Sequence, residues 1–194
     1  MRKALLSLLI LLSPGLAFAH TGVSAAHDVL HGFLHPLTGL DHVLAMVSVG
    51  LFAAQRGGRA LWALPLVFVS MMAVGGVLGM SGVALPGVEA VISASVIVLG
   101  ACVMSGLRIP TAFAAALVGV FAVFHGHAHG AEMPATASGL TYGLSFMAAT
   151  ALLHGLGIGL YLTVIRFSEA FRVPITRALG GLITLAGIAL LFGA

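Results

Sequence analysis

Long apolar runs constrain this chain more than any other feature of its sequence. Only 7% of the 194 residues are charged and 60% are hydrophobic, which excludes an ordinary water-soluble domain. The apolar runs are close to the length that a helix needs to cross a bilayer, and Gly, Pro or Arg bounds them. The sequence therefore predicts an all-α polytopic membrane protein with about six transmembrane helices. The expected spans are Leu34–Gln55, Ala60–Met80, Val88–Gly106, Pro110–Phe124, Gly139–Ile165 and Pro174–Phe192.

The N-terminal segment has the pattern of a secretory signal. Two basic residues precede an apolar core at 4–12, and Ala-Phe-Ala at 17–19 forms a small-x-small cleavage motif. We therefore expect a cleavable signal peptide at 1–19 and a single transmembrane domain at 20–194. An uncleaved anchor helix is the alternative.

The arginines beyond this segment predict the orientation in the membrane. All six fall in loops that would share one face, whereas the loops at 81–87 and 126–138 contain no Lys or Arg. Since basic loops stay cytoplasmic, we expect a multi-pass protein of the bacterial inner membrane with a periplasmic mature N-terminus. This asymmetry also explains the pI of about 9.8, and no basic stretch with interleaved aromatics indicates a nucleic-acid partner. The six residues are Arg56, Arg59, Arg108, Arg166, Arg172 and Arg177.

Three pairs of glycines at a spacing of four are typical of helices that pack closely in lipid. They are Gly75 with Gly79, Gly139 with Gly143, and Gly155 with Gly159. We expect them to face neighbouring helices, although some of the 26 glycines would show this spacing by chance.

Five of the nine histidines lie between His20 and His42. On an ideal helix, Asp28, His31, His35, His42 and Met46 would share a stripe roughly 60° wide. Because proline tends to start or kink a helix, we expect a short periplasmic helix carrying His31, with His35 at the mouth and the first span starting near Pro36. His20 would become the new N-terminus, where its amine and imidazole can chelate a metal, although a frayed terminal residue is the simpler interpretation.

The pair Asp41-His42 is the strongest sign of a functional site. A carboxylate beside an imidazole is costly in hydrocarbon, so it marks a place that handles an ion or a proton. The two side chains differ by about 100° around a helix, so we expect Asp41 to orient an imidazole from a neighbouring helix. A hydrogen bond that only locks two helices is the alternative.

A second cluster follows the fourth span and contains His125, His127, His129 and Glu132. In an extended periplasmic loop the three histidines would project to one side and gather cations. The short fourth span can instead continue into this segment, and for His127 and His129 a polar loop with chance histidines is equally plausible. His154 lies within the fifth span, where His42 and Asp41 are its expected partners and a backbone carbonyl is the alternative.

These donors indicate the class of metal. Neutral imidazole suits nickel, cobalt, copper and zinc, whereas Mg²⁺ and Ca²⁺ prefer shells of oxygen that five carboxylates cannot supply. No phosphate-binding loop for ATP is present. Two other functions remain open: a bis-histidine haem protein for electron transfer, and an intramembrane hydrolase that uses Ser81 with His154.

Two motifs resemble those of a known family. The segment His-Pro-Leu-Thr-Gly-Leu-Asp-His at 35–42 and the segment Phe-His-Gly-His-Ala-His-Gly-Ala-Glu at 124–132 resemble the signatures of the HupE/UreJ family of nickel and cobalt permeases. The resemblance implies secondary or facilitated uptake of Ni²⁺ or Co²⁺ as cargo, without enzymatic activity or a cofactor, in support of hydrogenase or urease maturation. It leaves the oligomeric state open. The residues that it implies in transport are His35, Asp41, His42, His125 and Glu132; His20, His31, His127, His129 and His154 are added from their spacing.

Overall fold

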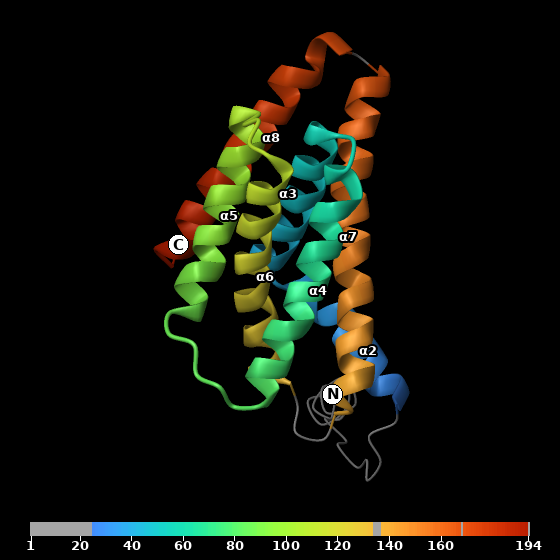
Figure 1. The fold of residues 1–194 in the computed structure, drawn as a ribbon, viewed down its shortest axis with the longest axis vertical. Coiled ribbons are helices and arrows are strands. Elements are labelled where there is room, and N and C mark those ends of the chain that lie inside the picture. The colour runs from blue at the N-terminus through green and yellow to red at the C-terminus, as the bar shows by residue number, and fades with distance from the viewer. Residues whose placement is uncertain (1–24, 134–136, 168, 194) are drawn as a thin grey trace, which may run out of the picture.

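The computed structural model describes residues 25–133, 137–167 and 169–193, and within these residues the chain is helical without strands (Figure 1). The predicted signal peptide and His20 lie outside the described residues. The helices are α2 (Ala25–Thr38), α3 (Leu40–Arg56), α4 (Ala60–Met80), α5 (Val88–Ser105), α6 (Thr111–Glu132), α7 (Gly139–Phe167) and α8 (Glu169–Leu191).

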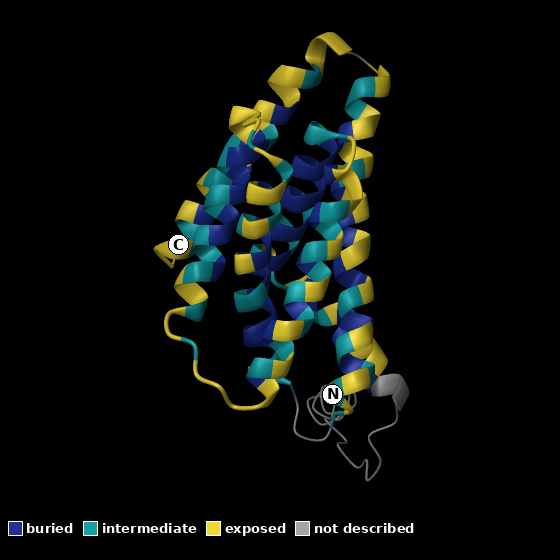
Figure 2. Cartoon of the chain, viewed as in Figure 1, coloured by how far each residue is buried: buried dark blue, intermediate teal, exposed yellow. Residues whose placement is uncertain are grey.

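Five of these helices, α4 to α8, are long and apolar enough to cross a membrane. The pair formed by α2 and α3 adds a sixth candidate span, which bends by 80° between Thr38 and Leu40. The exposed side chains along the bundle include large apolar ones such as Leu140 and Phe113, while the buried residues face the middle of the bundle (Figure 2). The prediction of an all-α multi-pass membrane protein is therefore confirmed.

Two predicted helix boundaries are wrong at the end that carries the histidines. The first span does not start near Pro36, because α2 continues through that residue to Thr38 and the break falls at Gly39. The fourth span does not end at Phe124, because α6 continues to Glu132. The second histidine cluster is thus helical rather than extended, which confirms the alternative that the fourth span continues into this segment.

A third boundary differs at the opposite end, where α8 begins at Glu169 rather than at Pro174. Pro174 is the sixth residue of α8, so the helix continues through it and loses only the hydrogen bond that an amide at this position would donate to the carbonyl of Ala170.

Glycines hold α4 and α6 in backbone contact. A β-carbon on Gly126 would overlap the carbonyl group of Met72, and Gly75 and Gly79 meet the backbone of α6 in the same way. This outcome confirms the packing role predicted for Gly75 and Gly79. The same prediction fails for three other glycines: nothing lies within 4 Å of a β-carbon built on Gly143, Gly155 or Gly159.

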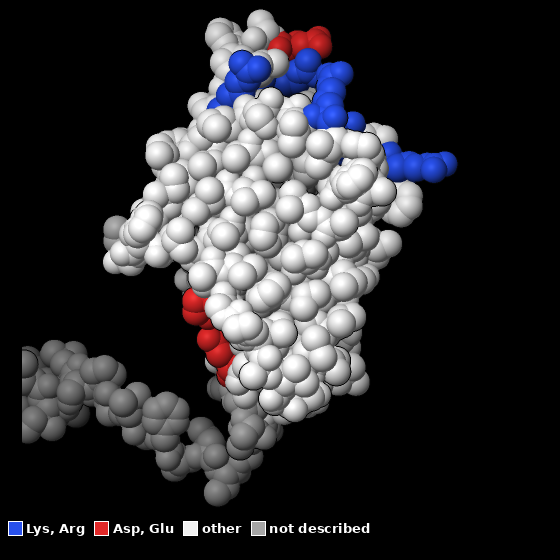
Figure 3. All heavy atoms as spheres, turned by 60° about the vertical axis from the view of Figure 1, so that its left-hand side comes forward, with Lys and Arg blue, Asp and Glu red and all other residues white. Residues whose placement is uncertain are grey.

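The charged side chains are divided between the two ends of the bundle. The loop between α3 and α4, the loop between α5 and α6, and the junction of α7 with α8 carry the arginines and meet at one end (Figure 3). The opposite end carries Asp41, Glu89 and Glu132 together with most of the described histidines. We call these the arginine end and the histidine end.

Candidate metal site

Three imidazoles from two helices meet at the histidine end. His42 lies in the first turn of α3, while His125 and His129 lie one turn apart near the end of α6. Nδ1 of His125 is 3.0 Å from Nε2 of His42, and Nε2 of His129 contacts the same nitrogen. The three side chains are buried, and His125 is fully excluded from solvent.

Asp41 orients the imidazole of its own neighbour in the chain. Its Oδ1 accepts a hydrogen bond of 2.8 Å from the backbone N–H of His42 and lies 3.1 Å from Nδ1 of the same residue. The expectation that Asp41 would orient an imidazole from another helix is therefore wrong. The carboxylate folds back within the first turn of α3, so the pair does not lock two helices together either.

Ser95 on α5 fixes the orientation of His125. Its hydroxyl donates to the carbonyl of Ile92 over 2.6 Å, so its oxygen is left to accept from Nε2 of His125 over 2.9 Å. This hydrogen bond places the proton of neutral His125 on Nε2 and leaves Nδ1 with a free lone pair. By the same reasoning, Asp41 draws the proton of His42 to Nδ1 and leaves its Nε2 free.

The two nitrogens that carry these lone pairs are 3.0 Å apart, so the lone pairs repel each other unless a cation binds to them. A proton or a metal ion can fill this role, since both bind the imidazole lone pair. Two imidazole nitrogens that bind one metal at about 2.1 Å and at a right angle are about 3 Å apart. The geometry of His42 and His125 therefore suits neighbouring ligands of one metal ion.

A second group of donors lies beside the first and shares His129. Ligand atoms of His35, His129 and Glu132 lie within 4.8 Å of one another, and Nε2 of His35 is 3.5 Å from Oε2 of Glu132. A cavity of about 220 Å³ reaches this group and also touches Asp41 and His42. Glu132 is exposed and His35 is partly exposed, so the second group forms the mouth of the first.

Glu89 is a site residue that the sequence reasoning missed. It lies in the first turn of α5 and lines the same cavity as Asp41 and Glu132. A carboxylate at the start of an apolar helix was a detectable signal, since intramembrane acids are rare.

Two other predicted ligands, His127 and His31, lie outside the buried group, as does Asp28 of the predicted stripe. His127 points to a different face of α6, and its Nε2 donates over 2.6 Å to the carbonyl of Val83. His31 stacks on His35, with 5.6 Å between the ring centroids, and therefore lies beside the mouth rather than in the buried group. Asp28 caps the start of α7 by accepting from the backbone N–H of Ser138 over 2.9 Å.

His154 is buried deeper in the bundle and is separated from the cluster by Phe68. The ring of Phe68 packs against His125 with 5.8 Å between centroids and against His154 with 5.2 Å. His154 is 1% exposed, and neither of its ring nitrogens has a hydrogen-bond partner among the described residues. It therefore bonds neither to Asp41 and His42 nor to a backbone carbonyl, which were the two expectations.

The comparisons with known proteins agree with the motifs at this site. A family model described as HupE / UreJ protein matches residues 8–190. The chain belongs to the HupE/UreJ family. A relative named Protein HupE, from Rhizobium leguminosarum bv. viciae, is 48% identical over 191 residues, which cover 98% of each chain. No solved structure matches the chain.

Membership in this family confirms the predicted resemblance. The HupE/UreJ family is a family of transporters for metal uptake. The chain is therefore a membrane permease and not an enzyme. The geometry agrees with both points. Ser81 is exposed and donates to the carbonyl of Val77, so it does not form a nucleophile–base pair with His154. His42 and His125 are also too close together to bind opposite sides of a haem iron.

Proposed function

We propose that this permease carries Ni²⁺, and alternatively Co²⁺, from the periplasm to the cytoplasm across the bacterial inner membrane. The observation that carries the proposal is that His125 and His129 both contact Nε2 of His42. Asp41 contacts the other nitrogen of the same ring, Nδ1. The arginine end would face the cytoplasm, as basic loops do, and the histidine end would face the periplasm with the mature N-terminus. The delivered metal would serve the maturation of a hydrogenase or a urease.

Capture begins at the mouth in this proposal. Glu132 is exposed enough to meet a hydrated ion, and its carboxylate attracts positive charge. His35 and His129 then replace water ligands of the ion. Because His129 also contacts His42, the ion can exchange ligands one at a time as it moves inward.

The buried group gives the site its preference among metals. Imidazole nitrogens suit divalent ions late in the first transition row, whereas Mg²⁺ and Ca²⁺ prefer oxygen. The carboxylate of Asp41 offsets part of the charge of the ion through His42. With three imidazoles and no thiolate, the ion is bound without the closed four-ligand cage that would prevent its release.

His154 is the next ligand on the inward path in this proposal. A fully buried imidazole needs an explanation when neither of its nitrogens has a partner among the described residues, because buried polar groups nearly always have one. A metal ion in transit would provide that partner. Phe68 lies between His125 and His154, so its ring would have to turn aside for the ion to pass.

Transport of nickel in proteoliposomes tests the proposed function. An inward-negative potential favours entry of a doubly charged ion by about 4.6 kcal/mol per 100 mV, twice the value for a single charge. We expect such a potential, imposed with valinomycin and a potassium gradient, to accelerate uptake of radiolabelled Ni²⁺ into vesicles that contain the purified protein. Excess Co²⁺ should compete, and excess Mg²⁺ should not. Uptake that ignores the potential, or that Mg²⁺ blocks as well as Co²⁺, would contradict the proposal.

Ser95→Ala tests whether the orientation of His125 matters for binding. Without the hydroxyl, Nε2 of His125 loses its acceptor and the ring no longer holds Nδ1 toward His42. Loss of a group that orients a metal ligand commonly weakens binding 10- to 100-fold, so we expect the KM for nickel to rise by about tenfold or more. The matched control is Ser93→Ala on the same helix, which should leave KM unchanged. An unaltered KM in Ser95→Ala would show that this hydrogen bond does not support transport.

A further inference from the structure

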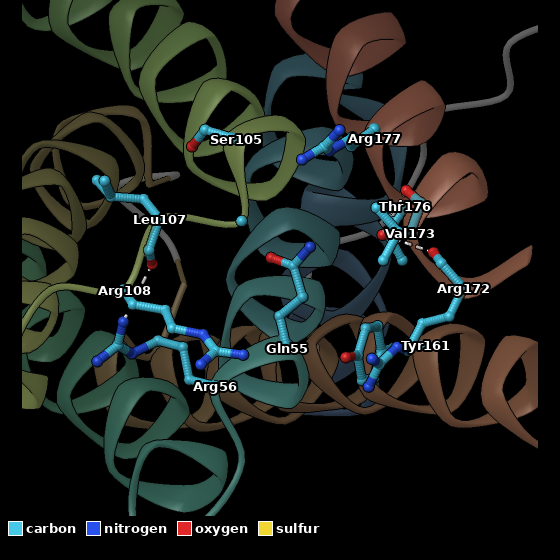
Figure 4. Close-up of a pocket in the computed structure, with 11 residues that line it drawn as sticks. Gln55, Arg56, Ser105, Leu107, Arg108, Tyr161, Arg172, Val173, Thr176 and Arg177 are labelled. Carbon is cyan, nitrogen blue, oxygen red and sulfur yellow. Dashed lines mark hydrogen bonds between the residues drawn. The ribbon is translucent and has the colours of Figure 1, made fainter. Parts of the chain in front are cut away.

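A cavity of about 570 Å³ lies at the arginine end, opposite the metal site. It opens among α3, α5, α7 and α8 and the loop that follows α5. Figure 4 shows Gln55 in the middle, with Arg56 and Arg108 on one side of it and Arg172 and Arg177 on the other. Four guanidinium groups from three separate segments of the chain thus line one cavity.

Within the described residues, no carboxylate neutralises this positive charge. No carboxylate lines the cavity, and in the described parts of the chain no arginine lies within 4.0 Å of one. The acidic residue nearest in sequence to Arg172, Glu169, is exposed at the start of α8 and does not line the cavity. Like charges gathered in a hollow repel one another, and the hollow also focuses their field.

One of the four arginines is fixed in place by the backbone. Nη1 of Arg56 donates to the carbonyl of Leu107 over 3.2 Å, and Nη2 donates to the carbonyl of Ile109. These bonds hold the loop that carries Arg108 against the end of α3. Nε2 of Gln55 donates to the carbonyl of Val103 over 2.9 Å, and its buried Oε1 has no partner in the described part of the chain.

The tendency of arginines to stay on the cytoplasmic side does not explain this convergence. That tendency requires basic residues in the loops, and Arg59 and Arg166 satisfy it without lining the cavity. Four arginines around one hollow, without an acidic partner, indicate a site for an anion.

We propose that this cavity binds the phosphate group of an anionic phospholipid. The guanidinium fork pairs with two phosphate oxygens at once, so a group of arginines favours phosphate as the ligand. The surroundings favour a lipid as its source. Leu107 and Val173 line the cavity and are 46% and 45% exposed, so acyl chains can lie on apolar side chains at its edge. Basic pockets between transmembrane helices on the cytoplasmic side commonly bind such headgroups.

The stability of the purified full-length protein in nanodiscs tests this proposal. Adding phosphatidylglycerol to phosphatidylcholine nanodiscs should raise the melting temperature of the wild type by roughly 5 °C, as expected for a ligand well above its Kd. The double variant R172Q/R177Q should lose this increase. Native mass spectrometry of the wild type should show one phosphatidylglycerol that stays bound under activation that removes phosphatidylcholine.

The matched control is the double variant R59Q/R166Q, which removes the same charge at the same end but outside the cavity. It should keep the response to phosphatidylglycerol. Equal loss in both double variants would mean that only the general surface charge attracts the lipid, and it would overturn the proposal. The proposal would also fail if the wild type showed neither the thermal shift nor the retained lipid. If inorganic phosphate alone in phosphatidylcholine nanodiscs gave the same shift, the ligand would be free phosphate and the lipid assignment would be wrong.

Discussion

His42→Ala is expected to abolish nickel uptake while the protein still inserts into the membrane. The substitution removes Nε2 of His42, the nitrogen that both His125 and His129 contact, so the two remaining imidazoles no longer share a common neighbour. Asp41→Asn should reduce uptake by about 100-fold, at the upper end of effects seen when the partner of a ligating histidine is changed. Its amide retains an oxygen to accept from His42 but lacks the negative charge that offsets the charge of the metal.

The measurement is the initial rate of uptake in proteoliposomes with equal amounts of inserted protein. His127→Gln is the matched control, because His127 belongs to the same helix as His125 and His129 and is also buried, but it donates to the carbonyl of Val83 instead of joining the site. A glutamine amide can make a similar hydrogen bond, so this variant should transport near the wild-type rate. Normal transport by His42→Ala would remove this group of imidazoles from the mechanism.

Gly126→Ala is expected to destabilise the bundle, because it places a methyl group at the contact between α4 and α6. The new β-carbon would lie 2.7 Å from the carbonyl carbon of Met72, which is a backbone atom and cannot turn aside as a side chain can. The helices α4 and α6 would have to separate, and inserted atoms in a packed interior typically cost 1–3 kcal/mol. Because Gly126 follows His125 directly, the displaced helix would also carry His125 and His129 away from His42.

Thermal unfolding in detergent and the rate of nickel uptake measure both consequences. Gly143→Ala and Gly155→Ala are the matched controls, since nothing lies within 4 Å of a β-carbon at either position. Alanine favours a helix over glycine by up to about 1 kcal/mol, so the controls should be as stable as the wild type or slightly more stable. Equal melting temperatures for Gly126→Ala and Gly143→Ala would contradict the close contact between α4 and α6.

Hydropathy and the placement of arginines predicted the membrane fold because both depend on the bilayer rather than on the details of packing. The span Ala60–Met80 matches α4, and the loops with arginine meet at one end as the charge pattern requires. The extended conformation predicted for the histidines of the second motif was wrong. His125, His129 and Glu132 are spaced by four and three residues, which places them on one face of a helix rather than along a strand.

The contacts that complete the site could not be predicted from the sequence because they depend on which helices touch. The hydroxyl of Ser95 reaches His125 only because α5 packs beside α6. Similarly, Gly126 and Gly130 allow α6 to continue along the backbone of α4 after its apolar run has ended. Local composition alone therefore ended that helix too early.

The break between α2 and α3 falls at Gly39, a residue without a side chain that could bind a metal. At Gly39 the backbone is extended, and a β-carbon there would lie 2.8 Å from Oδ1 of Asp41 and 3.3 Å from Nδ1 of His42. Because Gly39 has no side chain, the carboxylate of Asp41 has room to turn toward the ring of His42. If the proposed site binds metal, selection should act on the empty volume at Gly39 as well as on the ligands.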